Sequence, residues 1–351
     1  MARLLLQHLG QTLLATWLLA STVFLLGRAG GEEAVRLAQS DTAGFAASAT
    51  SAVTTPAARE AFRHQLGLDQ PLFYMGRSAA GTWQWRGWHN QYHEWLRALC
   101  HGSLGTSFRT GEPVAQRLTR ALAFTLPLTG TAAVLATVAA LALATWMAAA
   151  PRWQRPVRAA LVALHSLPLF VIALGLLLLL ANPELLDWFP AYGVVPGGTP
   201  GQPEGPVPAG LAGLAGLVLP MVALVLSALP ELTLLLAATL AHELRQPYIM
   251  TARAKGLRPG TVVRHHALRN ALLPTLAQLA ELLPTLVAGA VVVEVIFALP
   301  GMGRLLAGAA ATRDYPVLVG GVLLVGTARL LSLLLADLGY SRADPRIRWQ
   351  A

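Results

Sequence analysis

The chain has 351 residues, of which 55% are hydrophobic and only 12% are charged. Because about a quarter of the residues in an average soluble domain are charged, this composition excludes an ordinary water-soluble fold and indicates lipid as the solvent. The single cysteine, Cys100, excludes an intramolecular disulfide and a cysteine-based metal cluster, and the net charge of +9 must be interpreted loop by loop.

Six apolar stretches are long enough to cross a bilayer, whose core of about 30 Å needs roughly 20 apolar residues in a helix. They lie at residues 9–26, 121–149, 159–181, 211–240, 272–299 and 316–338. The first is longer than the core of about 7 to 15 residues in a typical export signal and is not followed by a clear cleavage site, so we expect it to be retained. The sequence therefore predicts an all-α membrane protein with six transmembrane helices.

The distribution of cations predicts that both termini lie in the cytoplasm. With that orientation, the short inside segments contain thirteen arginines and lysines, whereas the two short outside segments contain only Arg304 and Arg313. Such a bias is the usual signature of the cytoplasmic side. The long outside segment at 28–120 contributes little to this rule.

This orientation divides the chain into four expected parts. They are an N-terminal helix at 1–27, an extracytoplasmic region at 28–120, a five-helix core at 121–340 and a cytoplasmic tail at 341–351. The 28–120 region mixes helical spacing with the aromatic-rich "GTWQWRGWHNQYHEW", and the Pro- and Gly-rich residues 192–210 predict a second outside loop.

A basic block, "TARAKGLRPGTVVRHHALRNALLP" at residues 251–274, separates two apolar stretches and contains no acidic residue. Gly256 predicts the end of a short helix, because glycine accepts the left-handed conformation found there. Pro259 can open the next helix, and Pro274 predicts a break after about 14 residues, at the membrane entry.

Two interpretations fit this block. Its cations can simply hold anionic headgroups and set the topology. That interpretation does not account for Ala252, Ala254 and Gly256, whose small side chains allow another surface to come close. A docking platform accounts for both features.

The same residues resemble a known family, the permease subunits of binding-protein-dependent ABC importers of the dipeptide, oligopeptide and nickel class. "TARAKGL" at 251–257 and "LRNALLP" at 268–274 look like the family's cytoplasmic signature. Similar stretches follow in order along the chain: "LGLDQPL" at 66–72, "GSLGTSFRTGEPV" at 102–114, "SLPLFVIAL" at 166–174, "LPGMGRLL" at 299–306, "RDYPVL" at 313–318 and "DPRIR" at 344–348.

Two stretches depart from the family's pattern, and both lie in the expected outside region. "RAGGEEAV" at 28–35 stands where the family has "PGDP", and residues 73–95 are longer than the usual spacing. These departures concern the substrate and the contact with a binding protein and leave the core unaffected.

The resemblance implies a type I ABC importer permease fold with a cytoplasmic coupling loop at 241–272. In that loop a short helix fits a groove on a partner ATPase. The residues expected to couple to the ATPase are Ala252, Arg253, Ala254, Lys255, Gly256, Leu257, Arg258 and Pro259. The implied partners are a homologous second permease subunit, two ATPase subunits and an extracytoplasmic substrate-binding protein, all at the bacterial inner membrane.

The chain has no G-x-x-x-x-G-K-[ST] phosphate loop, so it is not expected to be an enzyme or to carry a cofactor. ATP and Mg²⁺ are expected on the partner ATPases. Small peptides are the first choice of cargo, and nickel or a modified peptide such as a glutathione-like substrate is the alternative.

Ionisable residues within the apolar stretches are candidates for the translocation path, because charges in hydrocarbon usually face an interior or a water-filled route. Glu281 and Glu294 lie in the fifth stretch and can line such a route or pack against a neighbouring helix. Arg329 and Asp337 lie in the sixth stretch, where Asp337 is expected near the surface, and Glu231 lies in the fourth.

Other classes of function find little support in the sequence. His89 and His93 have the spacing of one helical face, but no third ligand is fixed nearby, so no metal site is expected. "HEL" at 242–244 lacks the second histidine of a zinc protease motif, and no G-x-S-x-G occurs. An ATP-independent channel is the remaining rival, although no filter-like sequence is found.

Overall fold

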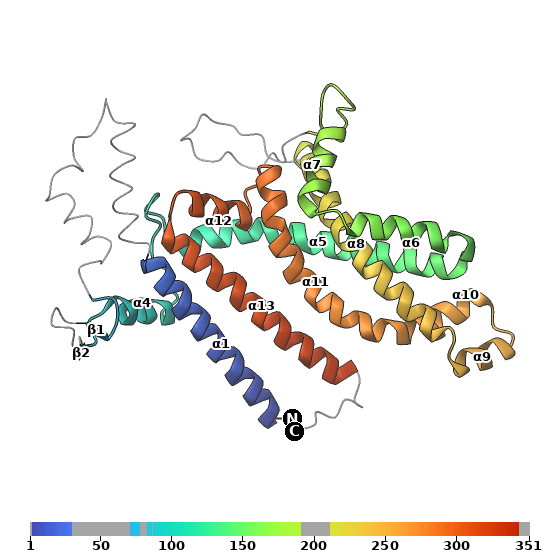
Figure 1. Cartoon of the computed structure of the whole chain (residues 1–351), viewed down its shortest axis with the longest axis horizontal. Helices are drawn as coiled ribbons and strands as arrows, with labels where there is room; N and C mark the ends of the chain where they lie inside the picture. Colours follow the sequence, from blue (N-terminus) through green and yellow to red (C-terminus); the bar gives the residue numbers. More distant parts are fainter. Residues whose placement is uncertain (1, 30–70, 78–82, 86, 191–210, 344–351) are drawn as a thin grey trace. The chain divides into compact units, whose positions relative to one another are not determined.

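The computed structural model describes residues 2–29, 71–77, 83–85, 87–190 and 211–343, and these are predominantly helical (Figure 1). The chain divides into two compact units, Met1–Thr119 with Gly308–Thr327 and Arg120–Ala307 with Ala328–Ala351. Most of the expected extracytoplasmic region before residue 71, the 192–210 loop and the last eight residues of the expected tail lie outside the described residues.

The first unit contains α1 (Ala2–Ala29), α4 (Gln91–Cys100) and an antiparallel ribbon of β1 (Met75–Arg77) and β2 (Trp83–Trp85). The all-helical expectation did not include this ribbon. Aromatic residues favour strands because they pack well on a pleated surface. Here the ring of Trp85 stacks on Tyr74 with a centroid distance of 5.8 Å.

Asn90 determines where α4 begins. Its side-chain oxygen accepts a hydrogen bond of 2.8 Å from the backbone N–H of His93, which satisfies a free donor of the first turn. His89 therefore precedes the helix, so the two histidines do not share one face of α4. The ring Nδ1 of His93 lies 3.0 Å from the hydroxyl of Tyr74 instead.

Helix α4 is held to the carboxyl-terminal part of α1 by Tyr92. The Tyr92 hydroxyl lies 2.7 Å from the Ser21 hydroxyl, and its ring packs edge-on against Phe24 at 5.6 Å. In the same part of α1, a Cβ added at Gly326 of α13 (Tyr315–Ala343) would lie 2.2 Å from Leu19. Glycine at this position lets the two helices approach closely.

A buried polar cluster around Asp314 joins two loops of the first unit that lie far apart in the sequence. Asp314 is 2% exposed, and its carboxylate accepts hydrogen bonds from the Ser107 hydroxyl at 2.5 Å and from the backbone N–H of Phe108 at 3.1 Å. Arg117 forms an ion pair with the same carboxylate at 3.3 Å and also donates to Ser107 at 2.9 Å. The family-like stretches at 102–114 and 313–318 are therefore in direct contact.

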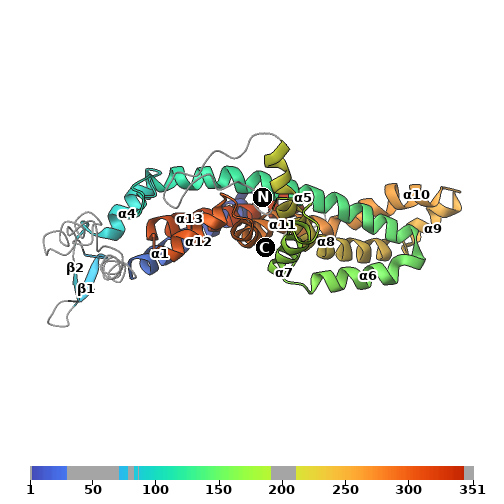
Figure 2. The same cartoon turned by 90° about the horizontal axis from the view of Figure 1, so that it is seen from above.

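The second unit is a helical assembly in which α6, α7 and α11 pack against α8 (Figures 1 and 2). Its helices are α5 (Val114–Ala149), which begins in the first unit, α6 (Pro151–His165), α7 (Leu169–Leu180), α8 (Leu211–Glu243), α9 (Pro247–Ala254), α10 (Pro259–Thr261), the π-helical η1 (Val262–Ala267), α11 (Leu268–Ile296) and α12 (Met302–Ala311), which ends in the first unit. Buried alanines recur every fourth residue along α5, at Ala132, Ala136, Ala140 and Ala144. Small residues at this spacing form a narrow face on which neighbouring helices pack closely.

The third apolar stretch was expected as one helix, but it is broken into α6 and α7, which meet at 100°. The break falls at Pro168, which has no N–H for a helical hydrogen bond and disfavours helical backbone at Leu167. Pro168 instead adopts φ −59° and ψ 145°, the extended conformation that precedes α7.

Two helices in the described part are long and apolar enough to cross a membrane, α5 and residues 215–243 of α8. The bent pair of α6 and α7 would make a third span. Shorter apolar segments lie at Leu13–Leu25 of α1 and Tyr315–Leu330 of α13. The six-span arrangement remains a prediction.

The expected break at Pro274 was wrong, because the backbone of α11 continues as a helix from Leu268 to Ile296. The irregular hydrogen bonding occurs earlier, in the six π-helical residues of η1. A proline inside a long helix can be accommodated where other groups satisfy the freed carbonyl.

Replacing Asp314 by alanine is expected to lower the free energy of unfolding by about 3 kcal/mol, because Arg117 and Ser107 lose their buried acceptor. Thermal unfolding of the detergent-solubilised chain measures the effect. Glu184→Ala, which removes an exposed carboxylate, serves as the control. Equal melting temperatures for Asp314→Ala and the wild type would contradict a stabilising role for this cluster.

Candidate functional site

The exposed turn after α9 has the geometry that the sequence predicted. Helix α9 ends at Ala254, and Gly256 adopts φ +74°, a conformation that glycine reaches without steric cost. Its backbone N–H donates to the carbonyl of Arg253 at 2.9 Å, and Pro259 opens α10. The prediction of a helix that ends at Gly256 and restarts at Pro259 is confirmed.

One face of α9 is buried in the second unit. Ile249 is 0% exposed and Ala252 is 6% exposed, and their spacing of three residues places both on one side of the helix. They belong to an apolar cluster with Ala144 of α5, Leu240 of α8 and Val262 of η1. The small side chain of Ala252 therefore lets α9 pack against its own chain and does not leave room for another surface, contrary to what its sequence context suggests.

The opposite face of this segment is exposed and cationic. We define the docking face by its exposed residues, Met250, Arg253, Ala254, Lys255, Gly256, Leu257 and Arg258. Met250 is 68% exposed and Leu257 is 38% exposed, so apolar side chains stand among the cations. The sequence has no acidic residue between Leu244 and Ala280, and the face is therefore complementary to a surface with carboxylates and an apolar groove.

A polar contact that the sequence analysis missed ties α9 to two long helices. The Tyr248 hydroxyl, at the start of α9, donates to the Glu243 carboxylate at the end of α8, with a distance of 2.5 Å. The amide of Asn270 in α11 donates to the same hydroxyl at 3.1 Å. Partial burial is the main cause that raises the pKa of Tyr248, and the hydrogen bond with Glu243 raises this pKa further. The hydroxyl is therefore protonated at neutral pH.

This contact adds to the packing that holds α9 against its neighbouring helices. Its inner face is packed on α5 and α8, and its first turn is tied to α8 and α11. Helix α9 is therefore connected to both α8 and α11. In the sequence, Glu243 and Tyr248 are five residues apart with a proline between them. This spacing alone does not predict that the two side chains are in contact.

Glu294, one of the two path candidates, is 0% exposed and both of its carboxylate oxygens are occupied. Oε1 accepts a hydrogen bond of 2.6 Å from the Thr125 hydroxyl, and Oε2 accepts from the backbone N–H groups of Gly303 at 2.6 Å and Arg304 at 3.2 Å. The Thr125 oxygen in turn accepts from the N–H of Met302 at 2.8 Å. The carboxylate thus satisfies the free donors at the start of α12, where negative charge is favourable.

Two glycines make room for this arrangement. A Cβ added at Gly301 would lie 2.1 Å from the Glu294 carboxylate, and one added at Gly303 would lie 2.2 Å from the Cα of Val291. Both distances are far below a van der Waals contact. The glycines of "LPGMGRLL" are therefore required by the close approach of α12 to α11.

The other ionisable candidates are placed differently. Glu281 is half-buried, and among the described residues its carboxylate has no hydrogen-bond partner. Glu231 of α8 accepts a hydrogen bond of 2.5 Å from Gln278 of α11. Arg329 is exposed, and the side chain of Asp337 lies outside the described part.

Within the described part of the chain, no group of three or more histidine, cysteine, aspartate or glutamate side chains is arranged to hold a metal ion. The exposed thiol of Cys100 stands alone there.

Comparisons with known proteins agree on one family. Residues 120–349 match the family described as binding-protein-dependent transport system inner membrane component. The chain is 34% identical over 301 residues to a di/tripeptide transport system permease protein of Pseudomonas aeruginosa, covering 82% of this chain and 84% of the relative. It is 30% identical over 292 residues to an oligopeptide transport system permease protein of Bacillus subtilis, covering 83% and 85%. A dipeptide transport system permease protein of Alkalihalophilus pseudofirmus is 30% identical over 316 residues, covering 84% and 87%.

Replacing Gly301 by alanine is expected to lower the free energy of unfolding by roughly 2 kcal/mol, because the added methyl group displaces the Glu294 carboxylate from the start of α12. Gly308→Ala is the matched control, since that helical glycine has no atom within 4 Å of an added Cβ. Melting temperatures of the purified variants test the difference. Equal melting temperatures for Gly301→Ala and Gly308→Ala would contradict a stabilising role for the Glu294 carboxylate at the start of α12.

Proposed function

Because the chain belongs to the family of binding-protein-dependent transport system inner membrane components, we propose that it is a permease subunit of an ABC importer that moves small peptides across the inner membrane. The peptide cargo is supported by the names of the di/tripeptide, oligopeptide and dipeptide permeases that the chain resembles over more than four fifths of its length. The observation that carries the mechanism is the cationic docking face, held on a helix whose other side is buried.

The proposed topology has six membrane spans with both termini in the cytoplasm. The first span is α1, and the region at 28–120 is extracytoplasmic. The core at 121–340 contains the other five spans, and residues 341–351 form a cytoplasmic tail. The positive charge of the short inside segments supports this orientation. In this arrangement the coupling loop at 241–272 presents the docking face to the cytoplasm.

We propose that the docking face binds a groove on a cytoplasmic ATPase subunit. Arg253, Lys255 and Arg258 would meet acidic groups, and Met250 and Leu257 would fill apolar positions. Rearrangement of the ATPase on binding and hydrolysing ATP would displace α9, and its connections to α8 and α11 would move those helices as rigid bodies. ATP and Mg²⁺ would bind to the ATPase subunits, since this chain contains no phosphate-binding loop.

The proposed assembly contains four further polypeptides. A homologous second permease subunit completes the translocation path, two ATPase subunits drive it, and an extracytoplasmic binding protein delivers the cargo. The family description, which names binding-protein-dependent transport, supports the last of these.

Glu281 and Glu294 have different roles in the proposed translocation path. Glu281 is half-buried and its carboxylate is free of described partners, so it can meet the amino group of a peptide. Glu294 contributes to the path only by fixing the position of α12, because both of its oxygens are occupied.

Other cargoes and a channel remain the alternatives. Nickel or a glutathione-like peptide would use the same architecture. Uptake assays with the reconstituted complex distinguish them from the main proposal. Uptake of labelled dipeptide that needs the binding protein and ATP supports it, and uptake that persists without the ATPase subunits favours a channel.

Replacing Gly256 by aspartate is expected to abolish peptide uptake while membrane insertion stays normal, because a negative charge enters the cationic docking face at its turn. Gly256→Asn is the control for backbone strain, since asparagine tolerates positive φ and is uncharged. We expect it to retain most of the uptake. Normal uptake by Gly256→Asp would contradict the assignment of the turn.

Replacing Glu281 by glutamine is expected to raise the KM for a dipeptide roughly tenfold, as removal of one charge-assisted hydrogen bond of about 1.5 kcal/mol would do. Glu231→Gln is the control, because that carboxylate is exposed and already bonded to Gln278. Initial rates of uptake over a range of peptide concentrations measure the effect. An equal KM for both variants would remove Glu281 from the path.

A further inference from the structure

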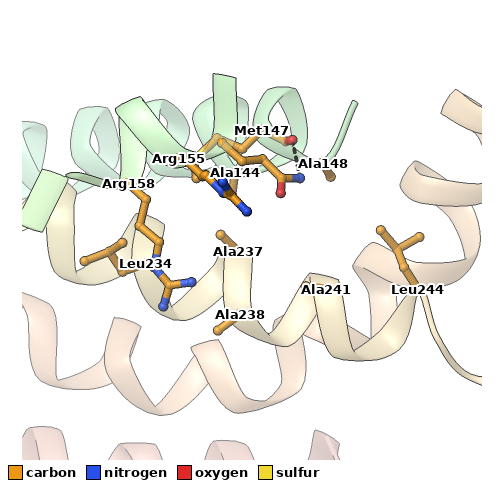
Figure 3. A pocket seen from close by; sticks show the side chains of 11 residues that line it. Ala144, Met147, Ala148, Arg155, Arg158, Leu234, Ala237, Ala238, Ala241 and Leu244 are labelled. Atoms are coloured by element: carbon orange, nitrogen blue, oxygen red, sulfur yellow. Dashed lines mark hydrogen bonds between the residues drawn. The ribbon is translucent and has the colours of Figure 1, made fainter. Parts of the chain in front are cut away.

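A cavity of about 210 Å³ lies between α5, α6 and α8, on the side of the second unit where α5 ends (Figure 3). A space of about 10–15 Å³ already holds one water molecule, so this cavity admits a much larger group. Alanines form most of its apolar wall, Ala144 and Ala148 from α5 and Ala237, Ala238 and Ala241 from α8. The hollow exists because these side chains end at Cβ.

The opposite wall is cationic. Arg155 and Arg158 are three residues apart on α6, which places them on the same helical face, and Figure 3 shows both side chains reaching towards α8. The Gln154 amide donates to the carbonyl of Met147 at 2.8 Å and holds the first turn of α6 against the end of α5. Among the described residues, the single ion pair is that of Arg117 with Asp314, so neither cavity arginine is neutralised there.

The surrounding side chains indicate the depth of the cavity in a membrane. Trp146 and Trp153, at the end of α5 and the start of α6, are 44% and 59% exposed. Tryptophan is enriched where headgroups meet the hydrocarbon. Further along α6, Val162 is 52% exposed, as a lipid-facing residue would be. The two arginines therefore lie at the headgroup level, and by the orientation proposed above, on which this inference rests, they lie in the inner leaflet.

We propose that this cavity binds the phosphate group of an anionic glycerophospholipid. The guanidinium groups of Arg155 and Arg158 hold the phosphodiester oxygens, since arginine recognises phosphate through paired N–H donors. An acyl chain covers the alanine wall of α8. Basic pockets between membrane helices on the cytoplasmic side suit this type of ligand.

The lipid is favoured over a soluble phosphate compound by the apolar wall. A soluble anion would leave Ala237, Ala238 and Ala241 in contact with water, whereas a lipid covers them. The bound lipid would also fill the space between α6 and α8. Because α8 carries the Glu243 contact with Tyr248, the lipid stabilises one of the helices that move with the docking face.

The test uses the complete importer complex, delipidated in mild detergent and titrated with dioleoyl phosphatidylglycerol or dioleoyl phosphatidylcholine, with native mass spectrometry to count bound lipids. We expect phosphatidylglycerol to bind more tightly. Arg155→Gln and Arg158→Gln should each weaken it roughly fivefold, and the double variant roughly twentyfold or more. Arg152→Gln should leave the affinity unchanged, because Arg152 is exposed on the same helix, as Arg155 and Arg158 are, but does not line the cavity.

Two further arms identify the source of the phosphate. Ala238→Leu keeps both arginines but fills the hollow, and it should release phosphatidylglycerol. Glycerol phosphate at millimolar concentration should fail to displace the lipid. Displacement would show that the site takes a soluble anion, and it would overturn the proposal of a lipid.

Lipid binding that does not depend on Arg155 and Arg158 would also contradict the proposal. Unchanged phosphatidylglycerol binding in the double variant, or an equal loss in Arg152→Gln, would overturn the site. Dipeptide uptake by the same preparations keeps the two proposals apart. Normal ATP-dependent uptake with no lipid specificity removes only the lipid site, whereas absent uptake in the wild-type complex removes the proposed function.

Discussion

Burial of a carboxylate in an apolar chain requires that its hydrogen-bond partners come from the chain itself, and this constraint shapes both units. Asp314 holds a loop near residue 107, and Glu294 holds the start of α12. Each is almost completely buried, and each contacts at least one backbone N–H group. An unpaired charge in such surroundings would cost several kcal/mol, so the positions of these segments follow from the need to satisfy the carboxylates.

Helix α9 is buried on one side and exposed to solvent on the other. Ile249 and Ala252 bury one side of α9, and Tyr248 connects it to α8 and α11 through a shared hydroxyl. The other side keeps Arg253, Lys255 and Arg258 exposed together with large apolar side chains. A face of this kind is stable in water through its charges and retains apolar area for a partner. Because α9 is anchored to α8 and α11, a displacement of α9 by the proposed partner would also move these two helices.

Several local features could be predicted because they depend on neighbouring residues only. Gly256 and Pro259 determine their own backbone conformations, and composition alone indicated the apolar helices. The contacts of Glu294 with Thr125 and of Asp314 with Ser107 join residues 169 and 207 positions apart, and no local pattern specifies such pairs. The expected break at Pro274 failed because the effect of a proline depends on what satisfies the freed carbonyl. The bend at Pro168 was not predicted, because residues 159–181 are apolar enough overall to suggest one helix even though His165, Ser166 and Pro168 interrupt the run.

The π-helical stretch η1 has a consequence for how α9 and α11 can turn relative to each other. Val262–Ala267 contains wider turns than an α-helix, and the N–H of Leu268 donates to the carbonyl of Val263, five residues earlier. Conversion of one such turn to α-helical geometry would release about one residue of chain, equivalent to a rotation of about 100° about the helix axis. A change of this kind in η1 would rotate the start of α11 relative to α9 without breaking either helix.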